Sequence, residues 1–257
     1  MSKDSTEKKS PLKMPPLRNP GQSLGEQLTD LTYGKMVMWW IVAVLGIVFA
    51  ANEWLRWWLD SPPQPFVASA IAVVLVGLAV WRVARIWPEV RCVALGHRGE
   101  KVVGQCLEQL RAEGYQVFHD IPGDGYNVDH VLVGPGGVFA VETKTRTKPC
   151  GRESAVVFDG ETVTVDGFAP DRDPIVQVQA AARQVREIIR RSTGLDVQVR
   201  PVVLYPGWFT RSARGVDVWV LNETAFPKWV HAEERSLDDA AVRQIAAGIA
   251  IHVRNGV

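Results

Sequence analysis

Two carboxylates on neighbouring predicted strands are the residues of this chain best placed to do chemistry. The strands flank the Gly-Pro-Gly-Gly segment 134–137, which predicts a tight hairpin turn centred on Pro135-Gly136. Counting outward along the antiparallel ladder places Asp129 opposite Glu142. Residues in such positions have Cβ atoms only about 4.5–5.5 Å apart, so like charges on them destabilise a sheet. A bound cation between the two carboxylates would explain their pairing.

Lys144 and Glu100 are expected to join these two acids. Side chains alternate along a strand, so Glu142 and Lys144 of the Glu-Thr-Lys triplet project to the same face. Glu100 lies on the inward, apolar face of a helix predicted over 97–113. Taken alone, Glu100 also fits a first-turn acid that interacts favourably with the helix dipole, and Asp129 fits a satisfied strand acid. The convergence of all these residues at this spacing favours a functional site.

Phosphodiester hydrolysis assisted by a divalent metal, the activity implied by the family resemblance described below, explains why these residue types are needed. The reaction needs an activated water and compensation of charge on the phosphoryl group, and one or two Mg²⁺ ions held by carboxylates provide both. An ammonium group nearby adds positive charge where the transition state is negative. The five histidines show no zinc-ligand spacing, and the chain has no Gly-x-Ser-x-Gly and no Walker-type Gly-Lys-Ser/Thr loop. A zinc site, a serine hydrolase and a nucleotide hydrolase are therefore not expected.

The same region resembles the nuclease-related domain (NERD), a relative of the PD-(D/E)XK nuclease superfamily. The resemblance is dense over residues 96–144 and extends in weaker form to about residue 205. The segments that carry it are Gly96-His97-Arg98-Gly99-Glu100, Gly114-Tyr115, Asn127-Val128-Asp129-His130-Val131-Leu132-Val133-Gly134-Pro135-Gly136-Gly137-Val138-Phe139 and Val141-Glu142-Thr143-Lys144. The fold that it implies is α/β, with a central mixed sheet flanked by helices.

The resemblance also implies a role for individual residues. Glu100, Asp129 and Glu142 match the metal-binding carboxylates of the family, with Mg²⁺ or Mn²⁺ as the implied cofactor. Lys144 matches the residue that orients or deprotonates the attacking water.

Gln177 is a weaker addition to this catalytic set. Residues 173–177, Asp-Pro-Ile-Val-Gln, resemble the family's Asn-Pro-x-x-Gln segment, with Asp173 in place of the usual asparagine. A glutamine at the edge of a helix's apolar stripe is more often a structural hydrogen bonder. Both interpretations of Gln177 stay open at this point.

Charge gives only local indications of the substrate. The net charge of +1 leaves no global basic surface of the kind typical of nucleic-acid-binding proteins. Arg146, Lys148 and Arg152 follow the Glu-Thr-Lys strand, where they would contact substrate phosphates beside the predicted metal site. A second basic group is better explained as the solvated face of a helix: Arg183, Arg186 and Arg190. We expect a nucleic-acid partner, DNA in preference to RNA.

Two apolar segments precede this region, over about 36–54 and 66–85. Each approaches the roughly 20 residues of a membrane span. Tryptophans flank them, as in the aromatic belt of a membrane interface: Trp39, Trp40, Trp54, Trp57, Trp58, Trp81 and Trp87. The short loop between the segments predicts a transmembrane helical hairpin, in which Gly46 and Gly77 would allow close packing in the lipid bilayer. A pair of buried core helices is the alternative interpretation.

Basic residues predict the orientation of the hairpin. Six lysines and arginines precede the first segment and four lie at or beyond the end of the second, between residues 82 and 98, whereas the loop holds only Arg56. Both ends are therefore expected in the cytoplasm, with the protein spanning the cell membrane twice and the loop outside. Residues 1–35, which are rich in proline and lysine, are predicted to form a disordered cytoplasmic tail. Three cysteines without a CxxC pair are expected to stay reduced.

The remaining residues, 92–257, are long enough for one α/β domain. Within it we predict helices over 97–113, 174–191 and 237–253, strands over 115–120, 127–133, 137–144, 199–205 and 216–221, and a β-rich excursion over 155–165. His130 would point away from Asp129 and is expected to be structural. Nothing in the sequence predicts an oligomeric state.

Three hypotheses about function stay open at this stage. The first is metal-dependent cleavage of nucleic acid near the cytoplasmic face of the membrane. The second is a membrane-tethered nucleic-acid-binding or sensor module with weak or no catalytic activity. The third is a structural anchor that recruits a partner protein through the proline-rich tail. The opposed carboxylates favour the first hypothesis, because a pure binding module has no need of them.

Overall fold

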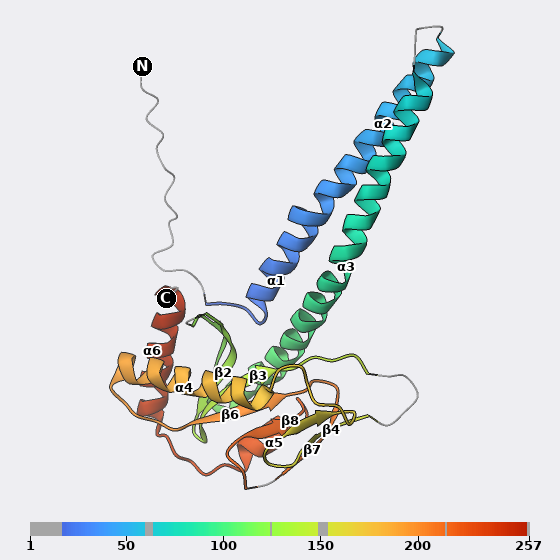
Figure 1. Cartoon of the computed structure of the whole chain (residues 1–257). Coiled ribbons are helices and arrows are strands. Elements are labelled where there is room, and N and C mark those ends of the chain that lie inside the picture. Colours follow the sequence, from blue (N-terminus) through green and yellow to red (C-terminus); the bar gives the residue numbers. More distant parts are fainter. Residues whose placement is uncertain (1–16, 60–63, 124, 149–153, 214, 256–257) are drawn as a thin grey trace, which may run out of the picture. The chain divides into compact units, whose positions relative to one another are not determined.

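The chain forms two compact units. The computed structural model describes residues 17–59, 64–123, 125–148, 154–213 and 215–255. One unit consists of residues 21–98 and is a pair of long helices. The other consists of residues 99–257 together with the segment that ends at Pro20, and it is an α/β domain (Figure 1).

The first helix of the helical unit begins earlier than predicted. Three helical segments follow one another without a break: α1 (Gln22–Thr29), the π-helical η1 (Asp30–Met36) and α2 (Val37–Trp58). The prediction that the disordered tail extends to residue 35 is therefore wrong for residues 22–35. Extending a helix costs far less than nucleating one, so the apolar segment can propagate its helix into the polar residues before it. Residues 1–16 of the predicted tail lie outside the described residues.

The second helix, α3 (Pro65–Gln109), joins the second apolar segment to the helix predicted over 97–113. The expected separation of these two helices is therefore wrong. Pro88 lies inside α3, where it removes one backbone donor and yet leaves the flanking turns helical. The short 3₁₀ segment η2 (Leu110–Glu113) completes the element.

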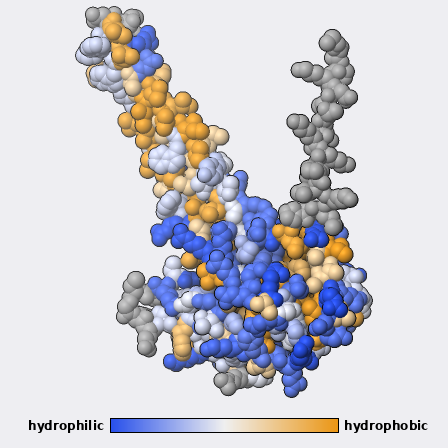
Figure 2. Space-filling view, turned by 180° about the vertical axis from the view of Figure 1, so that it is seen from behind, coloured by the Kyte–Doolittle hydropathy of each residue, from blue (hydrophilic) through white to orange (hydrophobic). Residues whose placement is uncertain are grey.

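Apolar side chains cover much of the outer surface of the helical unit, seen as the orange band in Figure 2. The helices over 22–58 and 65–113 are both long and apolar enough to cross a membrane. A Cβ built at Gly46 would lie 3.2 Å from Leu75 Cδ1, so this glycine does allow a close approach of α2 and α3. Gly77 does not serve this purpose, because no described atom of another segment lies within 4 Å of a Cβ built there.

The α/β domain is built on a five-stranded mixed sheet with the strand order β1-β2-β3-β6-β8. The strands are β1 (Gln116–Ile121), β2 (Val128–Gly134), β3 (Gly137–Thr143), β6 (Val199–Leu204) and β8 (Trp219–Leu221). The first three are antiparallel neighbours, whereas β6 runs parallel to β3 and β8 parallel to β6. A smaller sheet, β5-β4-β7, is formed by Ala155–Phe158 (β4), Val163–Val165 (β5) and Phe209–Ser212 (β7).

Helices cover both faces of the five-stranded sheet. α4 (Pro174–Thr193) and α6 (Asp239–Asn255) bury apolar side chains such as Val185 against one face. The end of α3 and the short α5 (Phe226–His231) bury side chains such as Leu107 against the other. The predicted fold class, an apolar helix pair followed by a mixed sheet flanked by helices, is confirmed.

Local chemistry explains why α4 begins where the sequence predicts. The Asp173 side chain accepts a hydrogen bond of 2.8 Å from the Ile175 amide, and Pro174 occupies the first helical position. Gly194 then ends the helix in a left-handed conformation, with φ of 75°. In the chain, α4 lies between β3 and β6. Its first turn lies close to the end of β3.

Candidate functional site

The β2–β3 hairpin has the register that the sequence predicts. Gly134 pairs with Gly137, and the ladder continues outward to His130 and Val141. Beyond that pair the Asp129 side chain links the two strands. Its Oδ2 accepts a hydrogen bond of 2.7 Å from the Thr143 amide. Asp129 therefore lies against the end of β3, next to Glu142.

Lys144 contacts two other predicted site residues, Glu142 and Gln177. Its Nζ donates to Glu142 Oε1 and to Gln177 Oε1, each at 2.5 Å. Its backbone amide donates to the Leu204 carbonyl at 2.8 Å, which fixes the chain just after β3. The lysine and Glu142 side chains keep 26% and 16% of their surface exposed, so the contact remains accessible from solvent. Gln177 is thus both a structural hydrogen bonder and part of the site, because the atom that it holds is Lys144 Nζ.

The pKa of Asp129 is raised well above its usual value of 3.8. The largest cause is desolvation of the carboxylate by the surrounding protein, followed by the negative charges of Glu142 and then Glu100. The hydrogen bond from Thr143 and the charge of Lys144 act in the opposite direction. Glu100 is buried, with 8% of its surface exposed. The structure thus brings all three predicted metal ligands close enough to act on one another.

These residues suit a hard cation such as Mg²⁺ by the chemistry of their donors, which are carboxylate oxygens. Thr143 Oγ1 adds a buried oxygen for which no hydrogen-bond partner is found among the described residues. The acids do not form a preformed cage, since no cluster of three His, Cys, Asp or Glu side chains in the described part of the chain has metal-binding geometry. Lys144 occupies one Glu142 oxygen in this arrangement.

The predicted phosphate contacts lie just beyond the end of β3. Trp208 Nε1 donates to the Arg146 carbonyl at 3.3 Å, and Lys148 Nζ lies 5.2 Å from the centre of the Trp208 ring. The Arg146 guanidinium is 3.4 Å from Asp171, whose side chain is 97% exposed, so this ion pair contributes little. Arg152 lies outside the described residues.

Gly99 has no room for a side chain, because α3 here lies close to the chain just after β3. A Cβ at Gly99 would come within 1.9 Å of Thr145 Cγ2, and Thr145 directly follows Lys144. Because Gly99 lacks a side chain, α3 can approach Thr145 closely, and this approach brings the next residue, Glu100, to the site.

Replacing Gly99 by alanine should consequently displace Thr145 and disturb the position of Lys144. Overpacking of this kind costs about 1–3 kcal/mol. We expect a lower melting temperature for the full-length protein in detergent, measured by circular dichroism. Gly77→Ala in the same helix is the matched control and should not destabilise the protein, because its Cβ meets no neighbouring segment. Equal melting temperatures for Gly99→Ala and wild type would contradict the proposed contact.

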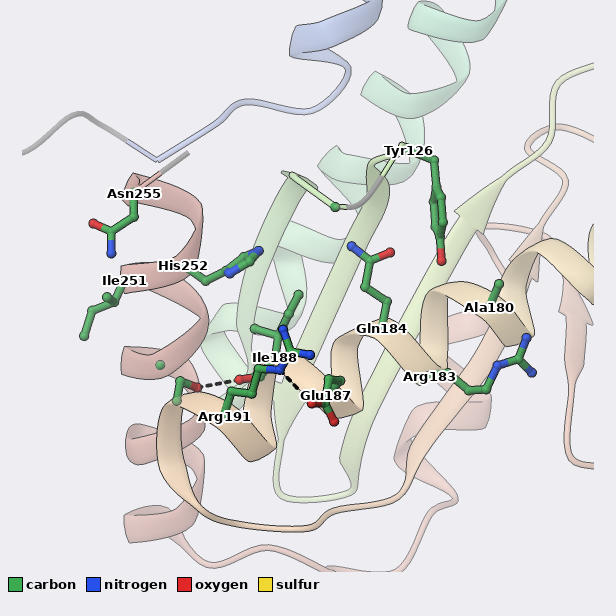
Figure 3. Close-up of a pocket in the computed structure, with 13 residues that line it drawn as sticks. Tyr126, Ala180, Arg183, Gln184, Glu187, Ile188, Arg191, Ile251, His252 and Asn255 are labelled. Atoms are coloured by element: carbon green, nitrogen blue, oxygen red, sulfur yellow. Dashed lines mark hydrogen bonds and ion pairs between the residues drawn. The ribbon is translucent and has the colours of Figure 1, made fainter. Parts of the chain in front are cut away.

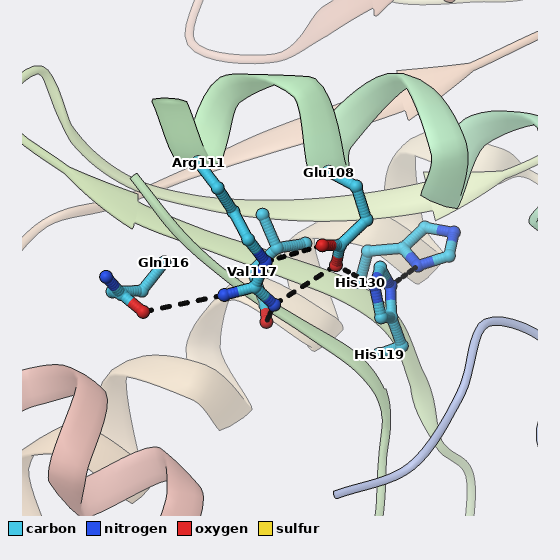
Figure 4. Close-up of polar contacts among 6 residues, drawn as sticks. All are labelled: Glu108, Arg111, Gln116, Val117, His119 and His130. Atoms are coloured by element: carbon cyan, nitrogen blue, oxygen red, sulfur yellow. Dashed lines mark hydrogen bonds and ion pairs between the residues drawn. The ribbon is translucent and has the colours of Figure 1, made fainter. Parts of the chain in front are cut away.

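A buried histidine pair, which sequence patterns do not predict, lies on the opposite face of β2 from Asp129 (Figure 4). The Nδ1 atoms of His119 and His130 are 2.9 Å apart, and His119 Nε2 lies 2.8 Å from a Glu108 oxygen. Arg111 binds the same carboxylate. Burial lowers the pKa of His119 and lowers that of His130 further, so both rings are neutral near pH 7. The expectation that His130 is structural agrees with this arrangement.

Asp120 is a further buried acid that sequence reasoning missed. It lies in β1 between His119, which pairs with His130, and Ile121, which pairs with Val128. Asp120 has a positive φ of 50°, Arg18 lies 3.0 Å from its carboxylate, and Asn127 donates to it at 2.8 Å. An ion pair formed across such a sequence separation leaves no local pattern by which the sequence could predict it.

A mixed sheet flanked by helices, with an aspartate and a Glu-x-Lys pair gathered at the ends of two adjacent strands, defines a nuclease-like α/β domain. Residues 95–206 match the family model of the Nuclease-related domain, so this part of the chain is a NERD domain. A stretch of 54 residues is 39% identical to an uncharacterized protein of Bacillus anthracis. That stretch covers 19% of this chain and 26% of the relative, so the chain spans about a quarter of the relative's length. No solved structure matches the chain.

Proposed function

We propose that this protein is a membrane-anchored, divalent-metal-dependent nuclease that hydrolyses phosphodiester bonds of nucleic acid at the cytoplasmic face of the membrane. The observation that carries the proposal is the position of Lys144 Nζ, held at 2.5 Å from both Glu142 and Gln177. The raised pKa of the neighbouring Asp129 supports it, because acids that crowd one another favour a cation between them. The NERD domain itself supports a nuclease-related function.

Each side chain has a distinct part in the proposed reaction. Glu100, Asp129 and Glu142 would hold Mg²⁺ or Mn²⁺, which when bound supplies Lewis-acid stabilisation of charge on the phosphoryl group. Lys144 would orient the attacking water and place its positive charge where negative charge develops. Gln177 would keep the lysine in place, since its Oε1 accepts from Nζ.

The proposed substrate is nucleic acid, with DNA preferred to RNA. Arg146 and Lys148 lie after the end of β3, next to the ring of Trp208. Cations in this position would bind phosphates on either side of the scissile bond.

A catalytically weak nucleic-acid-binding or sensor module is the second candidate function. The observation that favours it is the engagement of Glu142 by Lys144, together with the absence of a preformed three-acid cage among the described residues. In this alternative the acids and the lysine would serve recognition without turnover.

A cleavage assay with and without divalent metal separates the two functions. The full-length protein in detergent is incubated with plasmid, linear duplex and single-stranded DNA, and with matching RNA. We expect products with Mg²⁺ or Mn²⁺ and none with chelator, because the proposed reaction depends on the cation to stabilise charge on the phosphoryl oxygens. Binding of these substrates without cleavage under every metal condition would favour the second function.

The membrane location is proposed from the two apolar helices and the distribution of basic residues. A cysteine introduced at Gln64, in the hairpin loop, should react in intact cells with a membrane-impermeant thiol reagent. A cysteine at Ala240, in the α/β domain, should react only after the cells are lysed. Wild-type protein provides the background from the native cysteines. Labelling of Ala240→Cys but not Gln64→Cys in intact cells would reverse the proposed orientation.

A further inference from the structure

A pocket of about 570 Å³ lies between α4, α6 and the connection from β1 to β2 (Figure 3). This volume is within the range of small-ligand sites. His252 Nε2 lies 2.9 Å from the Pro122 carbonyl and ties α6 to that connection. None of the residues that line the pocket belongs to the catalytic set described above.

The pocket lies next to the proposed catalytic centre, further along the same face of α4. Ala180, Gln184 and Ile188 line it, and they follow Gln177 at helical spacing. Gln177 and Gln184 are seven residues apart, which corresponds to about 10 Å along the helix axis. Tyr126, at the other wall, precedes Asp129 by three residues. A flexible chain bound at Lys144 can therefore reach the pocket within a few of its units.

The side chains of the pocket combine three kinds of contact. Tyr126 keeps 44% of its surface exposed and offers an aromatic face. Gln184 has an amide oxygen that is buried without a hydrogen-bond partner among the described residues. Ile188 adds apolar surface to the same wall of the pocket as Gln184. A flat, polar-edged ring is the ligand group that uses all three.

Arg183 is the cation of this site that is left available for a ligand. It is exposed, and it makes no ion pair with any residue that the structure describes, whereas Arg186 is paired with Asp196. Arg190 and Arg191 are both paired with Glu187, which neutralises that carboxylate. An aromatic ring, an amide and a free guanidinium are the groups that recognise the base and the phosphate of a nucleotide.

We propose that the pocket binds a nucleotide of the same nucleic-acid strand that the catalytic centre cleaves, in single-stranded form. This inference rests on the proposed function and adds to it a substrate class and a subsite. Tyr126 stacks on the base, Gln184 contacts the base edge and Arg183 binds a phosphate.

The test measures binding separately from cleavage. Affinities for a fluorescent single-stranded oligonucleotide are measured by anisotropy with full-length Lys144→Ala protein in detergent and Mg²⁺, so that the strand stays intact. Adding Tyr126→Ala should weaken binding about tenfold, whereas Tyr126→Phe should bind as the parent does, because stacking on one ring is worth about 1–3 kcal/mol. Adding Arg183→Ala should also lower the slope of log affinity against log salt by about 0.7.

Arg186→Ala is the matched control, an exposed arginine of the same helix that lies outside the pocket and is already paired. It should leave both the affinity and the salt slope unchanged. The proposal is overturned if Tyr126→Ala and Arg183→Ala bind like the parent, or if Arg186→Ala weakens binding as much as Arg183→Ala. It is also overturned if the pocket variants change only the binding of a free mononucleotide.

Failure of this subsite and failure of the proposed function give different results. If the subsite is wrong, wild type still cleaves nucleic acid with metal and the pocket variants cleave equally well. If the proposed function is wrong, no cleavage occurs under any metal condition, whatever the binding data show.

Discussion

Replacing Lys144 by alanine should lower the rate of phosphodiester cleavage by about 10²–10⁴-fold, the usual contribution of a group that positions or activates the attacking water. The structure supplies the reason, since Lys144 Nζ is held by Glu142 and Gln177 at the end of β3. Affinity for nucleic acid should change little, because phosphates are expected to be bound mainly by Arg146 and Lys148. Cleavage rates under single-turnover conditions and anisotropy titrations measure the two effects separately.

Lys228→Ala is the matched control for this prediction, because Lys228 is an exposed lysine on α5 outside the site. It should leave the cleavage rate unchanged. Wild-type cleavage by Lys144→Ala would remove the lysine from the proposed mechanism. Equal losses of binding and cleavage would instead make Lys144 a substrate-binding residue.

The part of the site that the sequence predicts well is the part that local chemistry fixes. The turn over 134–137 sets the register of β2 and β3, and this register places Asp129 beside Glu142. Strand alternation places Glu142 and Lys144 on one face, where their side chains meet. Both arguments use only residues that are close in the sequence.

The features that the sequence did not predict depend on contacts between distant segments. β7, which was not predicted, pairs in parallel with β4 of the predicted β-rich excursion, with Ala155 opposite Phe209, and β7 is too short to leave a clear pattern of its own. The histidine pair depends on the register of β1 and β2 and on Glu108 of α3. Residues 22–35 are polar, and their helix is a continuation of the apolar one that follows. For β7 and the histidine pair the deciding interaction lies outside the window in which periodicity can be read, whereas the helix over 22–35 depends on the segment that follows it.

Asp129→Asn should stabilise the metal-free protein and abolish most of its stabilisation by metal. Asparagine removes a charge that desolvation and two neighbouring carboxylates make unfavourable, while its side-chain oxygen can still accept from the Thr143 amide. Each kcal/mol gained should raise the melting temperature of a chain of this size by about 2–4 °C. A cation that binds only the folded wild type should add about 2.7 kcal/mol at one hundred times its dissociation constant. Melting of full-length protein in detergent, with and without Mg²⁺ or Mn²⁺, measures both effects.

The pH dependence of stability tests the same carboxylate without metal. The pKa of Asp129 is higher in the folded protein than its usual value of 3.8, so between those two values the folded state holds more protons than the unfolded state. Stability should therefore fall as pH rises from about 4 through the raised pKa, and this component of the slope should be missing in Asp129→Asn. Because the repulsion involves Glu142 and Glu100, saturating metal should flatten the slope in wild type as well.

Asp171→Asn separates a site effect from the loss of any one negative charge. The Asp171 side chain is 97% exposed, so this variant should keep the wild-type pH slope and the wild-type response to metal. If Asp129→Asn behaves like Asp171→Asn in both measurements, the acids at the end of β3 do not form a metal site. Lys144 would then be bound to Glu142 as a permanent ion pair, and recognition of nucleic acid without cleavage would be the function that the domain supports.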